Sequence, residues 1–70
     1  MFYFFSRGKS FVRCEIRPSG GEGGYEIVVA EPGSAERVDV FSSSDQAHQH
    51  FLRVQQELND QGWWGPHGRD

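Results

Sequence analysis

The sequence predicts an α+β fold, in which a four-stranded antiparallel meander is followed by one C-terminal helix packed on one face of the sheet. Residues 2–41 consist of short strand-like runs separated by turn residues, and residues 43–61 carry apolar side chains at helical spacing. Short connections make consecutive strands antiparallel neighbours. One helix covers only one face of such a ββββα two-layer sandwich, so the other face is expected to be polar, functional or covered by a partner.

Length and charge limit the architecture and the classes of partner. The chain has 70 residues and a net charge of -3, which suit one small domain spanning residues 1–70 with a Trp/Gly-rich C-terminal tail at 62–70. The first 20 residues contain four basic and one acidic side chain, whereas the rest contain three basic and nine acidic ones. This polarity is able to steer a charged partner or to align two copies of the chain.

The runs 2–7 and 10–17 are expected to form a hairpin. Successive aromatic residues in the first run favour a strand, and apolar and charged residues alternate in the second. Gly8-Lys9 between them supplies a tight turn. The two runs therefore predict the first antiparallel pair of the sheet.

The runs 25–31 and 36–41 extend the predicted meander. The loop 19–24 contains four glycines, but a strand rather than a helix follows it, which does not fit a phosphate-binding loop. The sequence Glu31-Pro-Gly-Ser34 has the chemistry of a type II turn.

Alternation in the strands assigns side chains to two faces. Those expected beneath the helix are Val12, Cys14, Ile16, Tyr25, Ile27, Val29, Val38 and Val40. Those expected on the uncovered face are Phe11, Val28 and Phe41, with Phe5 or Tyr3, among the charged residues Arg13, Glu15, Arg17, Glu26, Arg37 and Asp39.

The helix carries start and stop signals. Ser43 followed three residues later by Gln46 fits a capping box, and Asp45 complements the helix dipole. Gly62 is expected to end the helix in the left-handed conformation, with Trp63 packing against the last turn. The stripe expected to face the core is Ala47, Phe51, Val54 and Leu58, widened by Leu52.

The sequence predicts no catalytic residue, metal site or cofactor. His48 and His50 are two residues apart on a helix and point in different directions, whereas helical zinc pairs are four apart. His67 lies in the tail. Cys14 is the only cysteine and falls on the inward face, where a thiol behaves as a small hydrophobe. We therefore expect a protein that is not an enzyme.

The candidate interaction residues come from the basic hairpin and the tail. Arg, aromatic and Trp side chains are enriched at interface hot spots, and two adjacent tryptophans are costly to leave in water. Trp63 is expected to close the core, which leaves Trp64 to cover the sheet edge or to contact a partner. The candidate residues are Arg7, Lys9, Phe11, Arg13, Arg17 and Trp64.

The element order ββββα, over about 60 residues, resembles the repeat of Pur-alpha-like and Whirly-like single-strand-binding proteins. That resemblance implies stacking of bases on an aromatic sheet face. The acidic net charge opposes it, because phosphate binding normally needs a basic surface.

These observations predict a small protein-interaction or self-associating domain, with a protein partner or a second copy in a homodimer. Weak single-stranded nucleic-acid binding through the N-terminal hairpin is the alternative. No run reaches the length of a membrane span, no signal sequence is evident, and a single cysteine gives no sign of an oxidising compartment. We therefore expect a cytoplasmic location without membrane contact.

Overall fold

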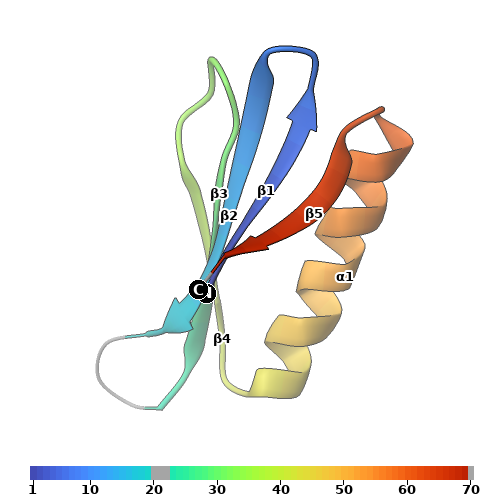
Figure 1. Ribbon diagram of the computed structural model, residues 1–70. Helices are drawn as coiled ribbons and strands as arrows, with labels where there is room; N and C mark the ends of the chain where they lie inside the picture. The colour runs from blue at the N-terminus through green and yellow to red at the C-terminus, as the bar shows by residue number, and fades with distance from the viewer. Residues whose placement is uncertain (20–22, 70) are drawn as a thin grey trace.

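The computed structural model describes residues 1–19 and 23–69 and places one helix on one face of a five-stranded sheet (Figure 1). The α+β class and the helix after the meander are confirmed. The predicted number of strands is wrong, because a fifth strand follows the helix. In chain order the elements are β1 (Phe2–Arg7), β2 (Ser10–Pro18), β3 (Tyr25–Ala30), β4 (Arg37–Phe41), α1 (Ser44–Asp60) and β5 (Trp64–Arg69).

The sheet has the order β4-β3-β2-β1-β5, and every neighbouring pair is antiparallel. The first four strands form the predicted meander, and the Glu31–Ser34 turn closes with a 3.2 Å backbone hydrogen bond. The glycine-rich loop predicted at 19–24 falls partly on residues 20–22, which lie outside the described residues.

Within the segment 62–70, predicted as a C-terminal tail, Trp64–Arg69 form strand β5. It pairs with β1, with Phe2 opposite Arg69 and Ser6 opposite Trp64, and its register shifts between Phe4 and Ser6. The red strand therefore runs beside the blue one in Figure 1, and the two ends of the sheet-forming chain lie together. Helix α1 thus carries the chain from the β4 edge of the sheet to the opposite edge.

Both predicted helix ends are confirmed. Ser43 is the N-cap and its hydroxyl accepts a hydrogen bond from the Gln46 N–H, while the Gln46 side-chain oxygen accepts from Ser42 rather than from Ser43. At the other end Gly62 has φ of 90°, its N–H donates to the Asn59 carbonyl, and the next N–H donates back into the last turn. These bonds form a Schellman motif, which turns the chain toward the sheet and starts β5.

The core lies between α1 and one face of the sheet. Tyr3 contributes to it by stacking on Phe51, with ring centroids 4.8 Å apart. Phe5 is fully buried, so the prediction that Phe5 or Tyr3 lies on the uncovered face is wrong. The buried cluster consists of Phe5, Val12, Cys14, Ile27, Val29, Ala47, Phe51, Val54, Leu58 and Trp63.

The side chains of strand β4 point to the sides of the sheet opposite to those predicted. Phe41 pairs with Tyr25 on the helix side and its ring lies 4.9 Å from that of His50. Val38 and Val40 therefore point away from the helix, and they are 45% and 65% exposed. The prediction fails because β4 is an edge strand, where the large Phe41 ring packs toward the core and the two valines are left at the surface.

Candidate interaction surface

The sheet face opposite α1 is the candidate site, and we call it the open face. Residues opposite each other in an antiparallel pair lie on the same face, so the register defines its members. No helix or strand among residues 1–19 and 23–69 lies over it. Its side chains are Phe2, Phe4 and Ser6 from β1, Phe11, Arg13, Glu15 and Arg17 from β2, Glu26, Val28 and Ala30 from β3, Val38 and Val40 from β4, and Trp64 and His67 from β5.

One side of the open face is aromatic. Trp64 and Phe11 both lie opposite Ser6, so they flank it in one row across three strands, and they are 72% and 60% exposed. The next row contains Phe4 beside His67, whose ring meets that of Trp64 edge-on with centroids 4.5 Å apart. This aromatic band gives the face a rigid apolar surface open to solvent.

Paired charges occupy the middle of the open face. Arg13 donates to Glu36 at 2.9 Å, and Arg17 pairs across strands with Glu26 and along its own strand with Glu15. The hydrogen bond from Arg17 to Glu26 raises the pKa of the guanidinium further above its ordinary value. Because the arginines are engaged by acids, this ionic band carries no excess positive charge.

Val28 shows that the side chains of this face pack together. It lies on the open face between Glu15 and Val38, yet it is only 1% exposed. Since no element of the described chain lies above it, neighbouring side chains on the same face cover it. The valines of β4 beside it form a third, aliphatic band.

The structure places four of the six predicted interaction residues on the open face and the other two, Lys9 and Arg7, elsewhere. The four on the open face are Phe11, Arg13, Arg17 and Trp64. The alternation in the second predicted strand had assigned the first three of them to this face. Lys9 lies in the β1–β2 turn and is exposed.

Arg7 is on the helix side and has a structural role. Its Nη1 atom donates to the Gln61 carbonyl at 2.8 Å, and its guanidinium lies 4.3 Å from the Trp63 ring centroid. A cation at a helix C-terminus stabilises the last carbonyls, and stacking on Trp adds a cation–π contact. The contact joins residues 54 positions apart, so local sequence patterns gave no signal of it.

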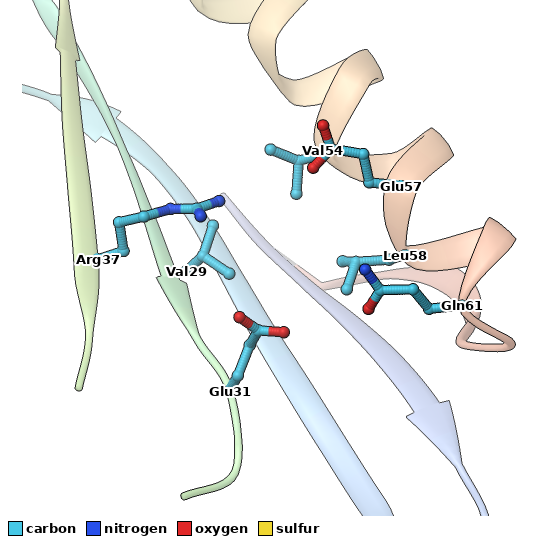
Figure 2. Close-up of a pocket in the computed structure, with 7 residues that line it drawn as sticks. All are labelled: Val29, Glu31, Arg37, Val54, Glu57, Leu58 and Gln61. Atoms are coloured by element: carbon cyan, nitrogen blue, oxygen red, sulfur yellow. The ribbon is translucent and has the colours of Figure 1, made fainter. Parts of the chain in front are cut away.

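A small cavity opens between the sheet and the helix (Figure 2). Figure 2 shows Arg37 extending from β4 toward the helix beside Val29, with Glu57 and Gln61 on the helix side. Its volume is about 90 Å³, well below the roughly 300–1,000 Å³ of ordinary ligand pockets. It is therefore not a candidate site for a metabolite.

A wider groove of about 310 Å³ continues along the helix side of β4. Arg37 and Asp39 line it, which corrects their predicted place on the open face. Asp39 lies 3.6 Å from Arg37 and 3.4 Å from His50 Nε2, an atom that is buried and makes no hydrogen bond. Arg53 and Glu57 also line the groove, so its wall carries charged groups of both signs.

Cys14 is fully buried on the helix side, and burial raises the pKa of its thiol to about 11. The thiol therefore stays protonated at neutral pH. Because only the thiolate form of cysteine is nucleophilic, Cys14 is not a candidate nucleophile. Among the described residues, no three His, Cys, Asp or Glu side chains come close enough to hold a metal ion. Within the same residues, no helix has the length and apolarity needed to cross a membrane.

No protein-family model matches the chain, and neither the curated proteins nor the solved structures include a significant match to it.

Proposed function

We propose that this chain is a protein-interaction domain, without catalytic activity, that self-associates through the open face. The observation that supports the proposal is the location of the exposed apolar side chains in the described part of the chain. Phe2, Phe11, Val38, Val40 and Trp64 lie together on this face, while Leu52 lies on the helix and Met1 at the terminus. These side chains form an aromatic band and an aliphatic band on either side of the ionic band, and exposed apolar surface gathered on one face and bordered by polar groups is typical of contact sites.

The size of the face indicates a weak interface. Five strands about 4.8 Å apart, each about six residues long at 3.3 Å per residue, give roughly 500 Å² per copy. Standard interfaces bury about 800 Å² per partner. We therefore expect association only at high protein concentration, in the cytoplasmic location that the sequence predicts.

Single-stranded nucleic acid remains the second candidate ligand, because the aromatic band offers rings for base stacking. The ionic band opposes this function, since Arg13 and Arg17 are already paired with Glu36 and Glu26. Phosphate neutralisation by these arginines would first require breaking those pairs.

The test compares two serine variants of exposed apolar residues. Phe11→Ser removes an exposed ring from the aromatic band, whereas Leu52→Ser removes a side chain of similar exposure from the helix. Loss of a hot-spot side chain costs more than about 1 kcal/mol, so sedimentation equilibrium is expected to give a dissociation constant about fivefold or more higher for Phe11→Ser. Leu52→Ser is expected to match the unmodified chain.

A single-stranded oligonucleotide at low salt is the second arm of this experiment. Two results together would favour nucleic-acid binding over self-association. They are a protein that stays monomeric at millimolar concentration and oligonucleotide binding that weakens as salt rises. Equal effects of the two serine substitutions would show that the contact lies elsewhere.

A further inference from the structure

The two edges of the sheet are built differently. Edge strands expose unpaired backbone groups and are normally protected against pairing with another chain. Strand β5 has such protection, because Pro66 lacks an N–H and the register with β1 is irregular. Strand β4 contains neither proline nor glycine and pairs with β3 residue for residue. No strand in the described residues covers its outer edge.

The charges of β4 select one way of pairing with another copy of itself. In an antiparallel pair related by a two-fold axis, one residue lies opposite its own copy. With Val38 at that position, Arg37 of each copy lies opposite Asp39 of the other, which gives two cross-strand ion pairs. Centring on Arg37 or Asp39 instead places like charges opposite each other, and centring on Val40 leaves Asp39 opposite Phe41.

The groove along β4 is compatible with this arrangement. Arg37 and Asp39 are 55% and 39% exposed, so both are accessible at the edge. Within one chain they lie 3.6 Å apart, so the cross-strand pairs would exchange partners between the two copies, and the groove beside them carries groups of both signs. On the opposite side of the sheet, the half-exposed Val38 would meet its own copy, with Val40 of each chain nearby.

We infer that the chain forms a two-fold dimer by antiparallel pairing of β4 with β4 of a second copy, centred on Val38. The two sheets then form one continuous sheet of ten strands, with both helices on the same side. The open faces join into a surface of roughly 1,000 Å², which exceeds the typical area per partner of a specific interface. This inference concerns the sheet edge and stands independently of the contact made by the open face.

Cysteine cross-linking tests the register. Opposite residues in an antiparallel pair have Cα atoms about 4.5–5.5 Å apart, within disulfide reach, so Val38→Cys is expected to form a covalent dimer under mild oxidation. Val40→Cys is the matched control on the same strand and face. Its Cα would lie about 13 Å from its own copy, four residues along the strand, and it is expected to stay monomeric.

The unmodified chain controls for Cys14, which is buried. Equal cross-linking of the two variants, no cross-linking at all, or cross-linking of Val40→Cys alone would overturn the inference. Arg37 and Asp39 lie on the helix side of β4, away from the open face, so the charge-exchange variants described next separate failure of this inference from failure of the proposed function.

Charge exchange gives an independent readout. Arg37→Asp places Asp opposite Asp, and Asp39→Arg places Arg opposite Arg, so each variant alone is expected to dimerise about tenfold or more weakly. Mixing the two variants restores opposite charges in the heterodimer, which is expected to form preferentially. A mixture that associates no better than either variant alone would contradict the pairing.

Discussion

Phe51→Ala is expected to lower the free energy of unfolding by about 3–5 kcal/mol, the usual cost of removing a buried phenylalanine ring. Phe51 is 5% exposed and lies at the centre of the helix stripe, where its ring meets that of Tyr3. A 70-residue domain has a total stability of only about 3–10 kcal/mol. The variant is therefore expected to be largely unfolded at room temperature, as measured by urea denaturation and circular dichroism.

Leu52→Ala is the matched control, because Leu52 is the next residue on the same helix and is 47% exposed, so the prediction that it widens the core-facing stripe is wrong. It is expected to change stability by less than about 1 kcal/mol. A folded Phe51→Ala variant with a nearly unchanged melting temperature would show that the helix does not face the sheet with this stripe.

Gly65→Ala is expected to lower the free energy of unfolding by about 2–3 kcal/mol, through overpacking and backbone strain. A Cβ atom at this position would lie 2.8 Å from the Phe4 carbonyl oxygen and 2.9 Å from the Phe5 ring, and Gly65 has φ of 155°. Neither contact is the flexible end of a side chain, so β5 would have to move away from β1.

Gly68→Ala on the same strand separates this effect from the general cost of alanine in β5. A Cβ atom there would be 3.7 Å from the Tyr3 ring, an ordinary contact. Urea unfolding is expected to give nearly unchanged stability for Gly68→Ala. Equal stabilities of the two alanine variants would contradict the close packing of β5 on β1.

Local signals in the sequence predicted the helix and the hairpins correctly. The Ser43 cap, the Gly62 stop and the Gly8-Lys9 turn depend on residues a few positions apart, so their chemistry is visible in the sequence. The alternation in the second strand likewise placed Phe11, Arg13 and Arg17 on the open face.

The errors arose where distant parts of the chain decide the outcome. Strand β5 contains Gly-Pro-His-Gly, which has low strand propensity, and it forms because the helix end directs it to the free edge of β1. The face of β4 depends on its register with β3 rather than on hydrophobicity alone. The role of Arg7 depends on a helix terminus that lies far away in the sequence.

The central claim is that the open face becomes covered by protein, and quenching of Trp64 fluorescence by acrylamide tests it most directly. Trp64 is 72% exposed on this face and Trp63 is 5% exposed in the core, so a Trp64→Phe variant supplies the background signal. At micromolar concentration Trp64 is expected to be quenched readily. At millimolar concentration its quenching is expected to fall toward that of Trp63, and this protection is expected to be lost in Phe11→Ser. Trp64 that stays equally accessible at both concentrations would contradict the account.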